Sequence, residues 1–219
     1  GRPLRSIFVL FNGKKIAFQF DHLESSDEII IEQDLDLKSR KVKNFKDYNS
    51  FLKSNNIILD HNEREKIILK KINSTSKSKD YKETLNLKLL EEVVNIVEDP
   101  NVLLVNFNKE YLKIPQEIII STLEKHQRYF PIFDSRGRLT NNFFVVANKK
   151  DKKKFITTGN KRVVEARLAD AKFFWDKDRS KNLIKQIANL KTVTFYEKLG
   201  TIYDKTQRIR KLAAMLSDD

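Results

Sequence analysis

The chain has 219 residues, of which 40% are apolar and 33% are charged, and it contains no cysteine. This composition excludes a disordered chain, a disulfide-stapled domain and a cysteine-ligated zinc site. Because no run of 18 or more residues is apolar, no segment is expected to span a membrane. The length suits one large domain or two small ones, and the start without an initiator Met or signal peptide predicts a piece of a longer chain.

The net charge of +13 is unevenly distributed along the sequence. Residues 1–108 hold 18 Lys and Arg against 17 Asp and Glu, whereas residues 109–219 hold 25 against 13. This asymmetry indicates that the second half meets a polyanion. A genome rich in A and T, which favours Lys, Asn, Ile and Phe codons, explains the charge equally well, so charge alone leaves both interpretations open.

The first 60 residues read mostly as strands. Residues 5–11 form an apolar, strand-like run, and Asn12-Gly13 after it is the strongest short hairpin signal. Residues 16–20 are expected to return as the partner strand, and residues 29–31 to form a third strand. The charged stretch 32–43 shows no clear period and is predicted to be a loop, followed by a short helix over 45–53.

Two helices and a strand are predicted next. Asp60 can cap a helix, with Glu63 at its third position, and residues 74–80 are polar enough to predict a flexible loop after it. Apolar spacing over 89–97 predicts a second helix, which Pro100 prevents from continuing. Residues 102–107 are a candidate buried strand.

The middle of the chain predicts a helix, a hairpin and a lysine-rich loop. Pro115 suits the first turn of a helix that runs to about Lys125. Strands at 130–133 and 143–147 flank a turn over 134–137. Residues 149–154 contain five lysines and one aspartate, and on their own they predict a solvated loop.

The last 60 residues read as mainly helical. A long helix is expected from about Asn160, with one apolar stripe and with ion pairs of Arg162 to Glu165 and Arg167 to Asp170. Gly200 is predicted to end a helix, and Thr201 with Asp204 to form the capping box of the next. Strands and helices do not alternate strictly, which favours an α+β fold. The apolar stripe of the long helix that begins at about Asn160 consists of Val164, Leu168, Ala171 and Trp175.

Candidate chemistry is basic and aromatic. The sequence has five glycines and no Cys, and it holds no phosphate-binding glycine loop and no thiol nucleophile. Its three histidines lie too far apart for a metal motif. We therefore predict no metal site and no catalytic residue. Arg128 and Tyr129 are adjacent, with His126 just before them. Arginine can fork onto phosphate, and aromatic rings can stack on unpaired bases, so these residues could bind RNA. The alternative is that Tyr129 and Phe130 pack in the core while Arg128 pairs with a carboxylate. The RNA-binding candidates are Arg128, Lys161, Arg162, Arg167, Lys198, Lys205 and Arg208.

Three motif blocks resemble the β subunit of bacterial glycyl-tRNA synthetase. Residues 114–133 contain a Pro-x-Glu helix leading into the signature His126-Gln127-Arg128-Tyr129-Phe130, residues 159–174 resemble a second block, and residues 195–205 a third. Residues 1–108 match more loosely, through Arg2-Pro3-Leu4-Arg5 and 89–93. Residues 24–42 lack both Gly and His, so the family's Gly-His-Arg-Phe element has no counterpart there.

The resemblance implies a cytoplasmic enzyme of two α and two β subunits. The α subunit would activate glycine with ATP and Mg and hold the aminoacylation site, so this chain alone would bind no cofactor, and the β subunit would hold and position tRNA(Gly). Residues 1–158 would form an α+β module with a mixed or antiparallel sheet, similar to the editing-like domain of phenylalanyl-tRNA synthetase. Residues 159–219 would be a helical segment leading into the next domain.

Three hypotheses follow from this resemblance. The chain is a tRNA-binding module, or it is a structural scaffold that packs and docks other parts of the synthetase without touching RNA. In the scaffold, Arg128 would be buried in an ion pair. A hydrolytic editing pocket is the third, although glycine is the smallest amino acid and gives a size sieve little to discard.

Overall fold

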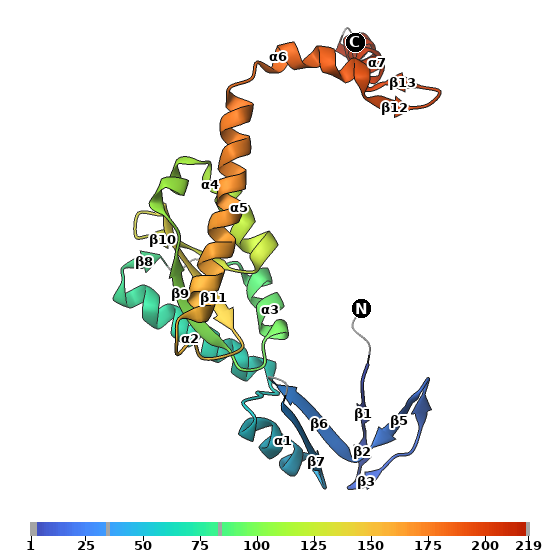
Figure 1. Cartoon of the computed structure of the whole chain (residues 1–219), viewed down its shortest axis with the longest axis vertical. Coiled ribbons are helices and arrows are strands. Elements are labelled where there is room, and N and C mark those ends of the chain that lie inside the picture. Colours follow the sequence, from blue (N-terminus) through green and yellow to red (C-terminus); the bar gives the residue numbers. More distant parts are fainter. Residues whose placement is uncertain (1–3, 34–35, 83–84, 218–219) are drawn as a thin grey trace.

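The computed structural model describes residues 4–33, 36–82 and 85–217, so Arg2 and Pro3 of the expected opening motif lie outside the described residues. Figure 1 shows an elongated molecule in which a β-rich N-terminal unit, a central helix-covered sheet and a C-terminal tail follow one another. The mixture of strands and helices confirms the α+β prediction.

The Asn12-Gly13 hairpin forms as predicted. Both residues have positive φ, 49° and 76°, as a tight hairpin turn requires, and they join β2 (Leu10–Phe11) to β3 (Lys14–Lys15). The returning strand expected over 16–20 is shorter than predicted. Only β4 (Gln19–Phe20) forms there, and it pairs with β5 (Leu23–Ser26), which also pairs with β1 (Ile7–Phe8).

The loop predicted over 32–43 is wrong, because most of this stretch is a strand. β7 (Asp36–Lys41) pairs antiparallel with β6 (Glu28–Gln33) and is exposed along its whole length, so no apolar alternation marks it in the sequence. β6 and α1 (Phe45–Ser54), the predicted short helix, pack together in a small core. Its buried residues are Ile29, Ile31, Val42, Phe51 and Leu52.

Helix α2 (His61–Ser78) begins where predicted, with the Asp60 carboxylate accepting a hydrogen bond from the N–H of Asn62 at 2.9 Å. The loop expected over 74–80 is wrong, since α2 continues to Ser78. The Thr75 hydroxyl donates back to the carbonyl of Lys71 at 2.9 Å, and Ser76 is buried, so these polar side chains have a place within the helix and its core. Helix α3 (Leu87–Ile96) confirms the next prediction.

A four-stranded antiparallel sheet forms the centre of the molecule. Its order is β8 (Tyr81–Lys82), β10 (Phe130–Asp134), β11 (Leu139–Ala147) and β9 (Asn101–Asn106). The strands predicted at 102–107, 130–133 and 143–147 are thereby confirmed.

Helices cover both faces of this sheet, so alternate residues of each strand enter different cores. Phe144 packs with α2 and α3, whereas the adjacent Phe143 packs on the opposite face. That second face is covered by α4 (Gln116–Ser121), the π-helical turn η2 (Thr122–His126) and α5 (Phe155–Arg179), with the 3₁₀ turn η1 (Lys109–Lys113) beside them. The helix predicted from Pro115 to about Lys125 is confirmed.

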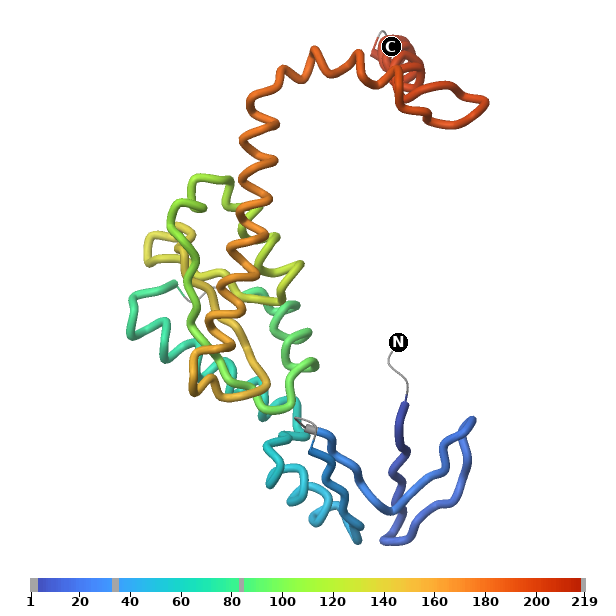
Figure 2. Tube along the Cα trace, viewed as in Figure 1, coloured from blue at the N-terminus to red at the C-terminus, as the bar shows by residue number. Residues whose placement is uncertain are grey.

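Helix α5 begins at Phe155, five residues before the predicted start, and the expected boundary between 158 and 159 falls in its first turns. Val164 and Leu168 are fully buried, and Ala171 and Trp175 pack against the same core, which confirms the predicted stripe. The outer part of α5 extends beyond the sheet, and the chain then turns away from its axis (Figure 2).

The tail after α5 contains a hairpin between helical segments. Its elements are α6 (Leu183–Gln186), η3 (Ile187–Thr192), β12 (Thr194–Tyr196), β13 (Gly200–Thr201) and α7 (Ile202–Ser217). Gly200 does not end a helix as predicted; it has a φ of 78° and begins the second hairpin strand. None of the described residues in 180–217 is buried.

Candidate nucleic-acid interface

The signature at 126–130 lies where η2 passes into β10. His126 is exposed, Gln127 is partly buried, and Tyr129 and Phe130 are buried on opposite faces of the sheet because they are neighbours at the start of a strand. The Tyr129 ring stacks on Phe143 with their centroids 5.4 Å apart. Packing therefore explains both aromatic residues, as the alternative interpretation of the sequence expects.

Arg128 is held by interactions within the chain. Its Nε lies 2.6 Å from a carboxylate oxygen of Glu92 on α3, and its guanidinium donates to the carbonyl of Lys125. Its side chain remains 44% exposed, so the ion pair is not the buried one that the scaffold hypothesis expects. The sequence alternative that Arg128 pairs with a carboxylate is confirmed, and the question of RNA contact stays a prediction.

The three candidates on α5 do not share one face. Arg162 and Arg167 are both exposed, but at 3.6 residues per turn they project about 140° apart around the helix. Lys161 is partly buried, with its Nζ 3.8 Å from a Glu165 oxygen. The predicted ion pairs of Arg162 with Glu165 and of Arg167 with Asp170 are not found among the described residues.

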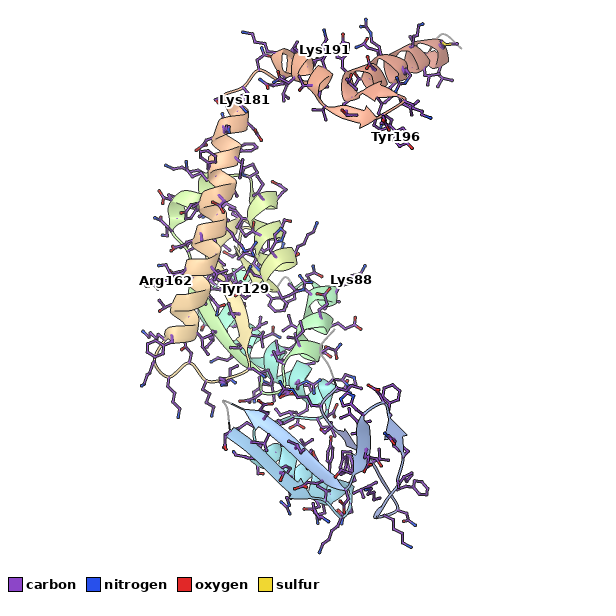
Figure 3. The ribbon with its side chains drawn as sticks, turned by 45° about the vertical axis from the view of Figure 1, so that its right-hand side comes forward. Lys88, Tyr129, Arg162, Lys181, Lys191 and Tyr196 are labelled. Atoms are coloured by element: carbon purple, nitrogen blue, oxygen red, sulfur yellow. The ribbon has the colours of Figure 1, made fainter. Side chains whose placement is uncertain are left out.

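A long stretch rich in positive charge lies beyond α5, in residues 181–211, which we term the cationic tail. This stretch holds eight Lys and Arg against two acidic residues. Figure 3 shows Lys181 at the end of α5 and Lys191 and Tyr196 farther along the tail, all away from the central sheet. The basic residues are Lys181, Lys185, Lys191, Lys198, Lys205, Arg208, Arg210 and Lys211; the acidic ones are Glu197 and Asp204.

Aromatic rings are interleaved with these cations. Lys205 Nζ lies 4.1 Å from the centroid of the Phe195 ring, and Lys191 Nζ lies 4.9 Å from that of Tyr203. The neighbouring Tyr196 is 63% exposed, so its ring is open to a ligand. Cations that track a phosphate backbone beside rings that stack on bases are the elements of a single-stranded nucleic-acid site.

Local hydrogen bonds fix the geometry of this surface. The predicted capping box is confirmed: the Asp204 carboxylate accepts from the N–H of Thr201 at 2.8 Å, and the Thr201 hydroxyl accepts from the N–H of Asp204 at 3.2 Å. The hydrogen bond from the Thr201 N–H, with a second from its hydroxyl, lowers the pKa of Asp204, so this carboxylate stays charged and engaged. The box connects the β12–β13 hairpin to the start of α7, which carries Lys205 and Arg208.

Of the sequence candidates, the structure brings together only those in the tail. Lys205 and Arg208 lie three residues apart on α7, next to the hairpin that carries Lys198. Arg128 lies on the central unit, between η2 and β10. The sequence prediction missed Lys191, Phe195 and Tyr203, because the contacts of Lys191 with Tyr203 and of Phe195 with Lys205 join residues far apart in the sequence.

Other kinds of site find little support in the described ranges. Within 4–33, 36–82 and 85–217, no three His, Asp or Glu side chains gather closely enough to hold a metal ion. No helix in these ranges combines the length and apolar character needed to cross a membrane.

Comparison with known proteins decides the family. Residues 1–219 match the family described as Glycyl-tRNA synthetase beta subunit. The chain belongs to this family. It is 39% identical over 218 residues to the glycine–tRNA ligase beta subunit of Clostridioides difficile, which covers 99% of this chain and 32% of that protein. Proteins of the same name from Thermodesulfovibrio yellowstonii and Listeria monocytogenes are each 34% identical over the same shares. The chain thus spans about a third of the length of these relatives.

Membership of the glycyl-tRNA synthetase beta subunit family confirms the resemblance predicted from the three motif blocks. The first block, 114–133, runs from the start of α4 into β10 and belongs to the core of the central unit. The second, 159–174, lies on α5. The third, 195–205, forms the hairpin and the first turn of α7, so it is the block that the structure exposes within the cationic tail.

Proposed function

We propose that this chain is a tRNA-binding part of a glycine–tRNA ligase beta subunit, which helps to bind and position tRNA(Gly). The observation that carries the proposal is the cationic tail, where lysines lie over aromatic rings on a surface that buries none of its described residues. Such a surface fits a phosphate backbone with unpaired bases.

The proposal extends to the whole enzyme. The ligase is a cytoplasmic heterotetramer of two alpha and two beta subunits, and ATP-dependent glycylation, with Mg, takes place at the active site of the alpha subunit. The central unit of this chain is a relative of the editing-like domain of phenylalanyl-tRNA synthetase. Its antiparallel sheet with helices on both faces supports that relationship.

Binding of tRNA(Gly) to the chain across a salt series tests the proposal. Each phosphate that the protein neutralises contributes about 0.7–0.9 to the slope of log affinity against log salt concentration. The triple variant Lys198→Glu, Lys205→Glu and Arg208→Glu should therefore bind at least tenfold more weakly at low salt, with a shallower slope. The fluorescence of Trp175, the single tryptophan, gives a second readout close to the tail.

A matched variant separates the tail from the net charge of the chain. Lys14, Lys15 and Lys46 are exposed on the N-terminal unit, and their replacement by Glu changes the net charge by the same amount. This control should retain most of the affinity. Equal losses in the two variants, or a flat salt response of the unmodified chain, would refute direct contact between the tail and RNA.

The scaffold hypothesis is the second candidate, and the ion pair of Arg128, although exposed rather than buried, favours it. The Arg128–Glu92 ion pair joins η2 to α3 and gives the most distinctive signature residue a structural role. Under this hypothesis the triple tail variant would bind tRNA(Gly) as the unmodified chain does, so the same experiment distinguishes the two.

A further inference from the structure

The loop between β11 and α5 carries the densest group of cations in the chain. Residues 149–154, which we term the lysine loop, contain five lysines and one aspartate. Like charges at this spacing repel one another, so a loop of this composition is expected to be mobile unless its backbone is held. In this structure it is held at both ends.

Asp151 holds the loop against the first turn of α5. Its carboxylate accepts hydrogen bonds from the N–H of Ile156 at 3.1 Å, the N–H of Thr157 at 2.8 Å and the hydroxyl of Thr157 at 2.6 Å. These bonds satisfy N–H groups that the helix leaves without partners at its start. The single acidic group of the loop is therefore turned toward the helix, and among the described residues it forms no ion pair with Lys150, Lys152, Lys153 or Lys154.

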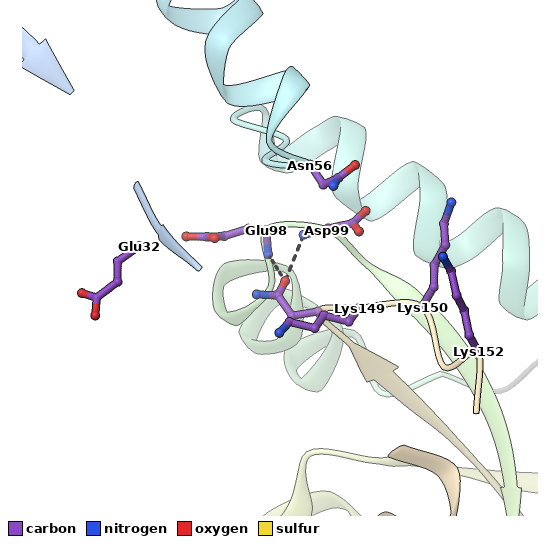
Figure 4. A pocket seen from close by; sticks show the side chains of 8 residues that line it. Glu32, Asn56, Glu98, Asp99, Lys149, Lys150 and Lys152 are labelled. Carbon is purple, nitrogen blue, oxygen red and sulfur yellow. Dashed lines mark hydrogen bonds between the residues drawn. The ribbon is translucent and has the colours of Figure 1, made fainter. Parts of the chain in front are cut away.

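Asn148 holds the other end of the loop. Its Oδ1 accepts from the N–H of Glu98 at 2.7 Å and from the N–H of Asp99 at 2.9 Å (Figure 4), which ties the end of β11 to the turn before β9. The backbone of the lysine loop thus begins and ends at fixed positions, and the lysine side chains project from it.

Four of the loop lysines have no counter-charge of their own. Within the part of the chain that the structure describes, the ammonium groups of Lys150, Lys152, Lys153 and Lys154 form no ion pair or hydrogen bond. A hollow of about 560 Å³ lies beside the loop, and the carboxylates of Glu32, Glu98 and Asp99 also line it. Lys150 and Lys152 both line the hollow, and Figure 4 shows them on the part of it away from Glu32.

We propose that the lysine loop is a second binding surface for the phosphates of the RNA that the cationic tail binds. This inference rests on the proposed function. The loop precedes α5 and the tail follows it, and a helix of 25 residues is about 37 Å long at 1.5 Å per residue. One continuous helix therefore fixes the separation of two cationic surfaces.

The fixed separation of the lysine loop from the cationic tail determines the length of RNA that can bind both surfaces. An RNA long enough to span about 37 Å can engage both surfaces, and its binding to the second surface then takes place at high effective concentration. A shorter RNA reaches only one surface. A folded tRNA satisfies the length requirement, whereas a short RNA hairpin does not, so the lysine loop distinguishes the two by size.

Binding by variants of the chain tests this inference. The double variant Lys152→Glu and Lys153→Glu leaves Asp151 and Asn148 intact. We expect it to bind tRNA(Gly) about tenfold more weakly at low salt and to lower the salt slope by about 0.7–0.9 for each phosphate that it no longer neutralises. An RNA hairpin with a stem of about six base pairs is shorter than about 37 Å, since even at the ~3.4 Å per base pair of B-DNA it would be about 20 Å long. It should bind this variant and the unmodified chain equally well.

Two further variants keep the result interpretable. Lys77→Glu with Lys79→Glu changes two exposed lysines at the far end of α2, so it matches the change in net charge and should leave tRNA affinity within about twofold. Lys152→Gln with Lys153→Gln removes charge without reversing it and should give a smaller loss in the same direction. Equal melting temperatures show that each variant is folded.

The possible outcomes separate this inference from the proposed function. If the loop variant keeps the affinity and salt slope of the unmodified chain while the triple tail variant loses binding, the tail binds RNA and the loop inference is overturned. An acidic protein would then be the remaining kind of partner for the loop. If neither variant loses affinity, both proposals fail.

Discussion

The side chain of Arg128 connects two secondary-structure elements, because its Nε lies 2.6 Å from a carboxylate oxygen of Glu92 on α3. Arg128 also has a φ of 60°, the left-handed conformation that commonly ends a helix and usually belongs to glycine. A side chain in this conformation costs about 1–2 kcal/mol. The interactions of the guanidinium with Glu92 and with the carbonyl of Lys125 offset part of that cost, since an exposed ion pair contributes about 0–1 kcal/mol.

This balance predicts an order of stability among variants of Arg128. Arg128→Ala removes the guanidinium and keeps the strained backbone, whereas Arg128→Gly removes the guanidinium and relieves the strain. We expect the alanine variant to be less stable than the glycine variant by about 1 kcal/mol, or about 2–4 °C in melting temperature. Thermal unfolding followed by circular dichroism measures the difference.

Binding of tRNA(Gly) by the same two variants tests the role of the Arg128 side chain in RNA contact. Unchanged affinity in both assigns Arg128 to structure. An equal loss of affinity in both, with melting temperatures unchanged, would instead make it an RNA-binding residue and contradict the predicted order of stability.

Tyr129 and Asn160 join the signature to α5, because the buried Tyr129 hydroxyl donates to the side-chain oxygen of Asn160. Tyr129→Phe keeps the ring stacked on Phe143 and leaves that oxygen without its donor. We expect a loss of about 0.5–1.5 kcal/mol in the free energy of unfolding, measured by urea denaturation. Phe143→Leu, which removes the stacking partner, is the control for ring packing, and an unchanged midpoint for Tyr129→Phe would show that water replaces the hydroxyl.

Strong periodicity made much of the central fold predictable. The stripe through Val164 and Leu168 places α5 on the sheet because apolar residues at helical spacing have to be buried together. Asn12-Gly13 predicted its hairpin because those two residue types tolerate positive φ. In both cases the local structure follows from properties of the residues within the element, so the local sequence is enough to predict it.

The wrong predictions concern segments whose cause lies elsewhere in the chain. β7 is exposed along its length and is a strand because β6 offers it a hydrogen-bonding edge. The last turns of α2 are rich in Ser and Thr, and they remain helical because α2 packs on the central sheet through Ile72 and because Ser76 is buried. Neither partner can be read from the local sequence.

The basic residues of the candidate interface could be identified from the sequence, but their arrangement in space could not. Lys198, Lys205 and Arg208 were identified from charge and from the third motif block, and the structure places them in one tail. Lys161, Arg162 and Arg167 were identified in the same way, but the helical period separates their directions. The pairing of Lys191 with Tyr203 depends on the fold of the hairpin and α7, so no spacing rule indicated it.

The surroundings of Gly200 and of Gly159 predict opposite effects of substitution by alanine. A Cβ on Gly200 would lie 2.5 Å from the Asp204 carboxylate, and its φ of 78° disfavours any side chain. Gly200→Ala should therefore displace Asp204 from Thr201, and amide hydrogen exchange at the start of α7 should accelerate. Gly159 lies on α5 with open space around it, so Gly159→Ala should stabilise the chain by about 0.5–1 kcal/mol through helix propensity. Faster exchange in both variants would contradict the comparison.

Stability should fall in acid because of Asp134, which begins the turn between β10 and β11. The N–H of Arg138 donates to its carboxylate at 2.8 Å, and this bond, aided by the Arg138 guanidinium, lowers the pKa of Asp134 in the folded chain. A lowered pKa in the folded state means that the charged form favours folding. The contribution is therefore complete above the ordinary Asp pKa of about 3.9 and is lost as the pH falls through the folded value.

Asp134→Asn tests this assignment, because the amide oxygen can still accept from the N–H of Arg138 while the charge is gone. We expect the variant to have a lower melting temperature than the unmodified chain at neutral pH. The difference should shrink as the pH is lowered below about 4, since Asp134 then becomes protonated in the unmodified chain as well. Asp36→Asn, which removes one carboxylate from an exposed ion pair 3.7 Å from Lys38 Nζ, is the control for the loss of one negative charge and should leave the melting temperature at neutral pH nearly unchanged. A difference between Asp134→Asn and the unmodified chain that persists in acid would show that the carboxylate acts through packing rather than through its charge.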